Sequence, residues 1–82
     1  MKSVIAPLPS NCLVRGHNFV RRGNEWVDVA VEKNPSARRV RIRYDSWEFF
    51  QLLQRYPKAL PLLSISRNVQ VELAGTIYEI HE

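Results

Sequence analysis

The amino-acid sequence predicts an α+β fold, a twisted antiparallel sheet or small open barrel of about five strands with one covering helix. Residues 26–32 and 40–44 alternate apolar and polar side chains, which is typical of strands with one buried face. Between residues 46 and 56 the apolar side chains recur at helical spacing instead. Two further alternating stretches surround Ala74-Gly75. The predicted order is therefore strand-strand-strand, helix, strand-strand.

The length of 82 residues leaves room for one domain, residues 1–82, since most domains contain about 50 to 250 residues. Hydrophobic residues make up 45% and charged residues 24% of the chain, a balance that predicts a folded domain and not a disordered one. Residues 1–11 include two of the five prolines and show no clear period. We expect them to form an extended lead-in, with residues 3–6 as a candidate edge strand.

The cysteine count and the hydrophobic runs bear on the compartment. A single cysteine, Cys12, cannot close an intramolecular disulfide, which favours a reducing compartment. Pro7 and Pro9 break the first apolar run before it reaches the length of a signal peptide, and no later run approaches the roughly 18 apolar residues of a membrane span. The prediction is a soluble, cytoplasmic protein with no membrane partner.

The first predicted strands lie between residues 12 and 32. Gly16 interrupts residues 12–20, which indicates two short strands or a bulge. Gly23-Asn24 then provides a turn before a strand over residues 25–32. A two-residue loop would pair Val20 with Val27 and Arg21 with Trp26, whereas a longer loop would pair Phe19 with Val27. The sequence leaves both registers open.

The second predicted hairpin joins residues 25–32 to residues 40–44 through a four-residue loop, 34–37. This register would pair Val29 with Ile42 on the apolar face. The same apolar face would pair Val31 with Val40 and Val27 with Tyr44. On the polar face the register would set Glu32 opposite Arg39 and Asp28 opposite Arg43. Both faces would thus be consistent in a single register.

A helix is expected from Asp45-Ser46 to Tyr56, with Asp45 as N-cap and Glu48 completing a capping box. Pro57 ends it. Trp47 in its first turn is expected to cover the sheet. The apolar stripe of the helix comprises Phe49, Phe50, Leu52, Leu53 and Tyr56.

The chain ends in a predicted hairpin with a two-residue Ala74-Gly75 turn. That turn would pair Val71 with Tyr78 and Val69 with Ile80, so that one apolar face continues across both strands.

The residues that could do catalysis or hold a metal are few. Cys12, His17 and His81 are the only nitrogen or sulfur ligands, and the three glycines are dispersed and do not form a phosphate-binding loop. Cys12 and His17 are five residues apart, a spacing that would send their side chains to opposite faces of one strand. We therefore expect no catalytic residues, no metal and no cofactor: the chain is not an enzyme.

A run of arginines in the basic strand is the sharpest functional feature. Arg39, Arg41 and Arg43 would lie on one face at intervals of about 6.6 to 6.8 Å, close to the spacing of successive phosphates. Twelve Lys and Arg against eight Asp and Glu give a formal charge of +4, which favours acidic partners. The candidate partner or nucleic-acid surface comprises Arg21, Arg22, Trp26, Arg38, Arg39, Arg41 and Arg43.

Three interpretations of these arginines stay open: a nucleic-acid surface with Trp26 as a base-stacking platform, a solvated face neutralised by Glu32 and Asp28, and a surface for an acidic protein. The sequence as a whole predicts a small non-enzymatic binding module, for protein–protein interaction as an adaptor or for homo-oligomerisation. A nucleic-acid-binding domain that uses Arg39, Arg41 and Arg43 is the alternative.

Residues 14–80 carry a resemblance to a known kind of module. A glycine and phenylalanine before a tight turn, a Trp-Val-Asp strand, a basic strand, an aromatic Leu-Leu helix ending in proline and a closing Gly-x-x-Tyr-Glu hairpin occur in that order. This order resembles the small β-rich C-terminal modules of some bacterial proteins with von Willebrand factor A domains, without the A domain or its metal-binding Asp-x-Ser-x-Ser loop. The resemblance implies an accessory or adaptor module with no transferable catalytic residues. The matching positions are Gly16, Phe19, Gly23, Trp26, Val27, Asp28, Tyr44, Phe50, Leu52, Leu53, Pro57, Gly75, Tyr78 and Glu79.

Overall fold

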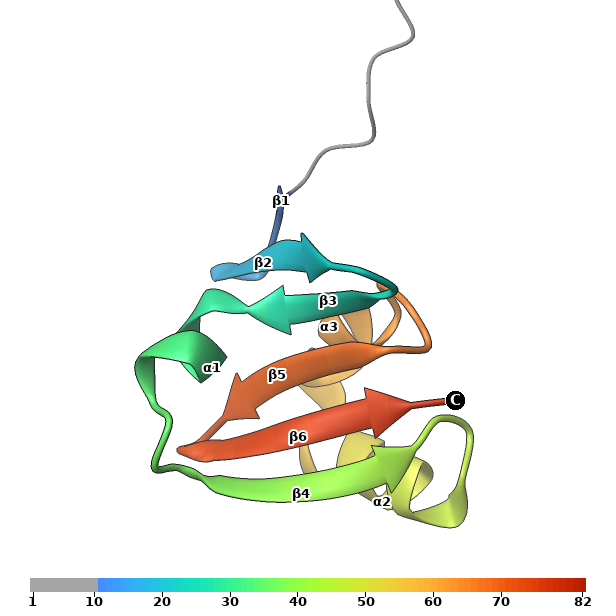
Figure 1. The fold of residues 1–82 in the computed structure, drawn as a ribbon. Helices are drawn as coiled ribbons and strands as arrows, with labels where there is room; N and C mark the ends of the chain where they lie inside the picture. The colour runs from blue at the N-terminus through green and yellow to red at the C-terminus, as the bar shows by residue number, and fades with distance from the viewer. Residues whose placement is uncertain (1–10) are drawn as a thin grey trace, which may run out of the picture.

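The computed structural model describes residues 11–82, so the candidate edge strand at residues 3–6 lies outside the described residues. Figure 1 shows one six-stranded sheet with short helices packed against it. In chain order the elements are β1 (Asn11–Val14), β2 (His17–Arg22), β3 (Glu25–Asp28), α1 (Val29–Lys33), β4 (Arg38–Arg43), α2 (Trp47–Arg55), the 3-10 turn η1 (Pro57–Ala59), α3 (Leu60–Leu63), β5 (Val69–Leu73) and β6 (Thr76–His81).

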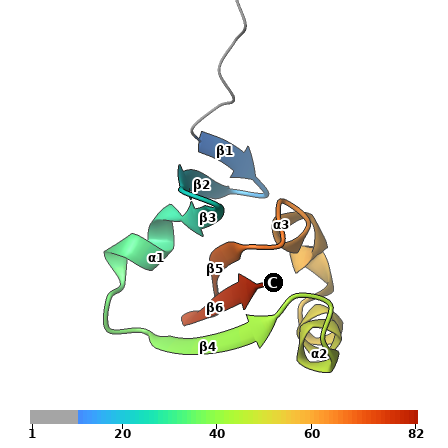
Figure 2. The same ribbon diagram turned by 45° about the vertical axis from the view of Figure 1, so that its right-hand side comes forward.

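The predicted α+β class is confirmed, but the arrangement of the sheet differs from the prediction. The strand order is β1-β2-β3-β5-β6-β4, and the sheet is mixed because β3 pairs with β5, and β4 with β6, in parallel. Residues 11–82 form six strands where about five were expected, and within this part of the chain β1 and β4 are the two edge strands. The single covering helix is replaced by α2 and α3 on one side of the sheet and α1 on the other (Figure 2).

The two hairpins with two-residue turns agree with the sequence. Gly23-Asn24 joins β2 to β3 and pairs Val20 with Val27, which settles the register that the sequence left open. Ala74-Gly75 joins β5 to β6 with Val71 opposite Tyr78, as predicted. Both turn residues there have positive φ, 51° and 85°, the backbone of a type I′ turn, which matches the right-handed twist of the strands.

The predicted strand over residues 25–32 is wrong beyond Asp28, where the chain turns into helix α1. The Asp28 carboxylate caps this helix by accepting a hydrogen bond from the Ala30 amide at 3.0 Å, and the Asn34 side chain donates to the Ala30 carbonyl at 2.9 Å. Val27 and Val31 both pack in a small cluster with Ile77. A short run of alternating valines fits a strand and a strand followed by a helical turn equally well, so the period alone could not separate them.

The second predicted hairpin does not form, because β4 lies at the far edge of the sheet beside β6, in parallel, with Arg41 opposite Glu79. The expected pairs Glu32–Arg39 and Asp28–Arg43 are therefore wrong. Glu32 instead pairs with Arg22, and Asp28 with a histidine on β2. Alternating strands close in sequence suggested a hairpin, but the segment that begins with α1 carries the chain past two strand positions, those of β5 and β6, before β4 begins.

The main core lies between the sheet and helices α2 and α3. Helix α2 begins one residue later than predicted, because Ser46 Oγ and not Asp45 accepts the hydrogen bond from the Phe49 amide, at 3.3 Å. Trp47 does not cover the sheet, since 72% of its surface is exposed. The buried residues of this core are Phe19, Ile42, Phe49, Leu52, Ala59, Leu62, Leu63, Val69, Val71, Tyr78 and Ile80.

Within the apolar stripe of α2, truncation of Leu52 is expected to be more damaging than truncation of its neighbour Leu53. Leu52 is 4% exposed whereas Leu53 is only partly buried. Leu52→Ala should lower the free energy of unfolding by about 2 to 5 kcal/mol, and Leu53→Ala by less, because the cost follows the buried volume removed. The midpoint of urea unfolding measures both, with the exposed Gln54→Ala as a control that should change little. A larger loss for Leu53→Ala would mean that α2 is rotated about its axis.

Candidate functional site

The predicted partner surface is divided between the two faces of the sheet. Trp26 pairs with Val69, which belongs to the core beneath α2 and α3, so Trp26 lies on the helix-covered face and packs partly buried against that core. By alternation, Arg21 and Arg38 lie on the same face. The opposite face, called here the open face, carries Arg22, Arg39, Arg41 and Arg43. Trp26 therefore cannot serve as a stacking platform beside these arginines, and that expectation is corrected.

A polar network crosses four strands on the open face. Gln70 on β5 donates to Glu25 on β3 at 2.9 Å and accepts from Arg39 on β4 at 3.3 Å. Arg39 also donates to Glu79 on β6 at 2.8 Å. Nearby, Arg22 forms an ion pair with Glu32 at 2.9 Å. Arg22 and Arg39 each therefore have a carboxylate partner. The partner of Arg39 is Glu79 and not Glu32, which the sequence indicated.

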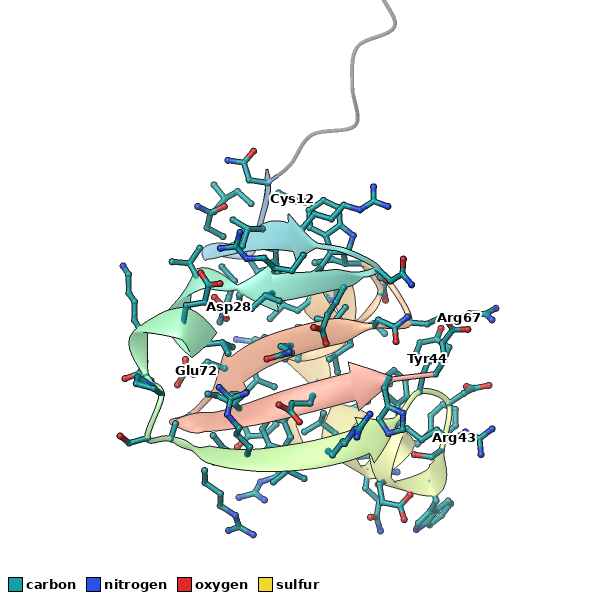
Figure 3. All side chains as sticks on the ribbon, in the orientation of Figure 1. Cys12, Asp28, Arg43, Tyr44, Arg67 and Glu72 are labelled. Atoms are coloured by element: carbon teal, nitrogen blue, oxygen red, sulfur yellow. The ribbon has the colours of Figure 1, made fainter. Side chains whose placement is uncertain are left out.

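Arg41 and Arg43 differ from Arg39. Both are exposed, and neither has a carboxylate within ion-pair distance among residues 11–82. Figure 3 shows Arg43 near the end of β4, close to Tyr44 and Arg67. The Arg67 guanidinium lies 5.7 Å from the centre of the Tyr44 ring and 3.9 Å from Glu82. Unneutralised positive charge is thus concentrated along the second half of β4.

The backbone of β4 also has unpaired groups at its outer edge. The Tyr44 amide donates to the His81 carbonyl of β6 at 2.6 Å. In a parallel ladder alternate residues direct both backbone groups to the same neighbour, so the amides and carbonyls of Val40 and Ile42 also face β6. The amides and carbonyls of Arg39 and Arg41, and the amide of Arg43, then face away from the sheet, where β4 has no neighbouring strand among residues 11–82. The Arg43 carbonyl accepts a hydrogen bond from the Ser46 amide at 3.2 Å.

A groove of about 230 Å³ runs between this edge and helix α2. Val40, Arg41 and Ile42 form its wall on β4, with Leu52 and Tyr78 beneath. The other wall belongs to α2 and comprises Glu48, Gln51 and Arg55. The edge of β4 therefore offers hydrogen-bonding groups beside a partly apolar channel.

The phenol of Tyr78, on the floor of the groove, has a shifted pKa. Burial, and then the neighbouring Tyr56, raise the pKa of Tyr78 above its ordinary value of 10.0, while Arg55 and Arg38 act in the opposite direction. The Tyr56 and Tyr78 rings meet edge to face with their centres 6.3 Å apart. Tyr78 therefore stays neutral at physiological pH and serves as part of the groove floor.

The structure also contains a buried ionisable pair that the sequence did not reveal. The Asp28 side chain is 2% exposed and contacts His17 Nδ1 at 2.7 Å, from β2 (Asp28 is labelled in Figure 3). It also accepts from the Glu72 amide at 3.2 Å, in addition to the Ala30 amide. An aspartate directly before an apolar run is the one available signal, because aspartate is a favoured helix N-cap.

The reason given against a Cys12–His17 pair was wrong. The two residues are not on one continuous strand, because the chain turns at Arg15-Gly16. Cys12 is opposite Phe19, and His17 is two residues from Phe19, so both side chains belong to the helix-covered face. Within residues 11–82 no three or more histidine, cysteine, aspartate or glutamate side chains are gathered closely enough to hold a metal ion. The same part of the chain has no helix of the length and apolarity that crossing a membrane requires.

Replacement of Asp28 should destabilise the fold more than its size suggests. Asp28→Ala leaves the amides of Ala30 and Glu72 without their acceptor and should cost about 2 to 4 kcal/mol. Asp28→Asn keeps one carbonyl oxygen and should cost less. Denaturant unfolding measures the loss, and hydrogen exchange should accelerate at those two amides. An unchanged midpoint for Asp28→Ala would contradict the role of this carboxylate.

Stability should fall at alkaline pH in part because of Tyr78. The pKa of Tyr78 is raised in the folded state. Its contribution to the free energy of unfolding is therefore fully present below the pKa of about 10 that tyrosine has in the unfolded chain, and is lost as the pH rises through the higher pKa of the folded state. Tyr78→Phe should therefore show a shallower loss of stability than the wild type above about pH 10. Thermal unfolding between neutral and alkaline pH tests this, with Tyr44→Phe as the control that leaves Tyr78 in place.

Comparison of the chain with protein-family models, with curated proteins and with solved structures finds no match. The resemblance to the modules of von Willebrand factor A domain proteins therefore stays a prediction. What the chain does has to be inferred from the edge of β4, the groove beside it and the charges around both.

Proposed function

We propose that this chain is a non-enzymatic protein-interaction module that binds an extended segment of a partner protein along the free edge of β4. The supporting observation is that β4 is an edge strand of the described sheet, with outward backbone groups at Arg39, at Arg41 and at the amide of Arg43. Addition of a strand to such an edge gives affinity through main-chain hydrogen bonds and specificity through alternate side chains.

The charges and the groove define the chemistry of the bound segment. Side chains that point to the open face would meet Arg41 and Arg43, which lack carboxylate partners among the described residues. Side chains that point to the other face would enter the groove beside Val40, Ile42 and Leu52. A strand alternates its side chains between two faces, so the fitting segment alternates acidic and apolar residues.

Self-association through the same edge is disfavoured. If β4 of one copy paired with β4 of another, the arginines of both strands would lie side by side on one face. Like charges directly opposite each other destabilise strand pairs. The edge therefore suits a different, acidic chain better than a second copy, and the protein-partner form of the sequence-based hypothesis is favoured over homo-oligomerisation.

Nucleic-acid binding has weaker support. Arg39 is already held by Glu79, and Glu25 and Glu32 lie on the same open face. These carboxylates interrupt the basic track that a phosphate backbone would follow, and the tryptophan expected beside it lies on the other face. Tighter binding of nucleic acid than of an acidic peptide is therefore the alternative outcome of the experiment that follows.

The test separates backbone pairing from charge at one residue, Arg41. The probe is a fluorescent peptide of alternating glutamate and valine, followed by anisotropy. Arg41→Gln should weaken binding by up to about fivefold, the value of one exposed ion pair. Arg41→Pro also removes an outward amide and should weaken it by about a further tenfold. Proline is tolerated at an edge strand whose amide faces solvent, and the thermal unfolding midpoint verifies that the variant folds.

An equal loss of peptide affinity in Arg41→Gln and Arg41→Pro would show that only the charge of Arg41 contributes to binding, and would overturn the strand-addition proposal. Tighter binding of a random single-stranded oligonucleotide than of the peptide, with a steep salt dependence, would also overturn it in favour of nucleic acid. A peptide of alternating lysine and valine is the matched control and should not bind. Light scattering of the unbound chain should report a monomer.

A further inference from the structure

A second hollow, of about 430 Å³, lies on the helix-covered side, away from the open face. It is bounded by the β1–β2 turn, by the end of α2 with η1, and by α3 and the end of β5. Its volume falls in the range of about 300 to 1,000 Å³ that is typical of small-molecule sites. We call it the basic pocket, after the side chains described next.

Positive charge enters the basic pocket from two separate parts of the chain. Arg15 comes from the β1–β2 turn, and Arg55 and Lys58 come from the end of α2 and from η1. No carboxylate lines the pocket, and none of the three cations has an ion-pair partner among residues 11–82. Like charges held around one hollow repel each other, and a bound anion relieves that repulsion.

His17 adds a fixed imidazole to the same wall. Its Nδ1 lies 2.7 Å from the Asp28 carboxylate, which is buried and holds the ring through that atom. With Nδ1–H donated to Asp28, Nε2 is left on the opposite side of the ring and has no hydrogen-bond partner in the described part of the chain. Nε2 can therefore accept from a protonated phosphate oxygen when the ring is neutral or donate to an anionic oxygen when it is charged.

The rest of the basic pocket is apolar. Ala59 and Leu62 are buried in the core and form part of its lining, and Leu73 and the ring of Tyr56 are partly buried there. The Arg55 guanidinium lies 5.6 Å from the centre of the Tyr56 ring. A ligand with both an anionic group and a flat apolar body would use both kinds of wall.

We propose that the basic pocket binds a small phosphate monoester with an aromatic or other apolar body. A phosphate group presents three strong acceptor oxygens and close to two negative charges at neutral pH. That pattern suits three cations and an imidazole better than the two oxygens and single charge of a carboxylate. This hollow is distinct from the groove beside β4, and Arg55 is the one residue that lines both. The test below therefore changes Arg15 and Lys58 and keeps Arg55, so that failure of either proposal leaves the other standing.

The probe is phenyl phosphate, titrated into the full 82-residue chain while amide and histidine-ring NMR shifts are recorded. Shifts should concentrate on Arg15, His17, Lys58 and Leu73, which line the pocket. Inorganic phosphate and benzoate should each bind more weakly, because each lacks one half of the recognised chemistry. The Glu/Val peptide bound at β4 should not compete.

The deciding variant is Arg15→Gln with Lys58→Gln, which removes two pocket charges at exposed positions and leaves Arg55 in place. It should weaken phenyl phosphate binding by about tenfold or more. Arg21→Gln with Lys33→Gln removes the same charge elsewhere and should change the affinity by less than about twofold, since only the long-range field changes. Equal weakening in both double variants, equal affinity for benzoate, or an absence of shifts at millimolar phenyl phosphate would each overturn the proposal.

Discussion

The carboxylate of Asp28 is the interaction on which the rest of the arrangement depends. It accepts hydrogen bonds from the amide that begins α1 and from an amide of β5, and it contacts the imidazole of His17 on β2. It therefore ends β3, starts the helix that carries the chain away from the sheet, and joins strands on both sides of β3. A buried charge is tolerated only when its partners replace the water it has lost, and these three partners do so.

The position of β4 follows from that departure. Once α1 leaves the sheet, β5 can take the place beside β3 that a simple hairpin would have given to β4, and β4 becomes an edge. Exposed edges invite uncontrolled strand pairing, which proteins resist by placing charges on them. The arginines of β4 therefore oppose pairing with another copy, and under the proposed function the same side chains would attract an acidic strand. One set of side chains gives both results because both depend on the same charge.

Local turn chemistry could be predicted from the sequence, and long-range pairing could not. Ala74-Gly75 restricts its own hairpin to one register, so the partner of Tyr78 was predicted correctly. Gly23-Asn24 placed the first turn correctly but left two candidate partners for Val27, of which the structure has Val20. The partner of β4 depends on α1, a five-residue helix that the valine alternation concealed. The arginines were predicted correctly as exposed, but their division between two faces required the register of every strand. The Asp28–His17 contact is compatible with one of the two registers that the sequence left open, but it also depends on the end of β3 at Asp28, which the valine alternation concealed.

The excess positive charge of the chain is not uniformly distributed, and this argues that part of it has a specific use. Arg22, Arg39 and Arg67 each have a carboxylate within ion-pair distance. By contrast, Arg41 and Arg43 beside the groove, and Arg15, Arg55 and Lys58 around the basic pocket, have none among residues 11–82. Charge that only maintained solubility would not need to surround a hollow or follow a free strand edge. Its concentration at the two places where the fold also leaves backbone groups or apolar walls exposed is the physical basis of the two binding proposals.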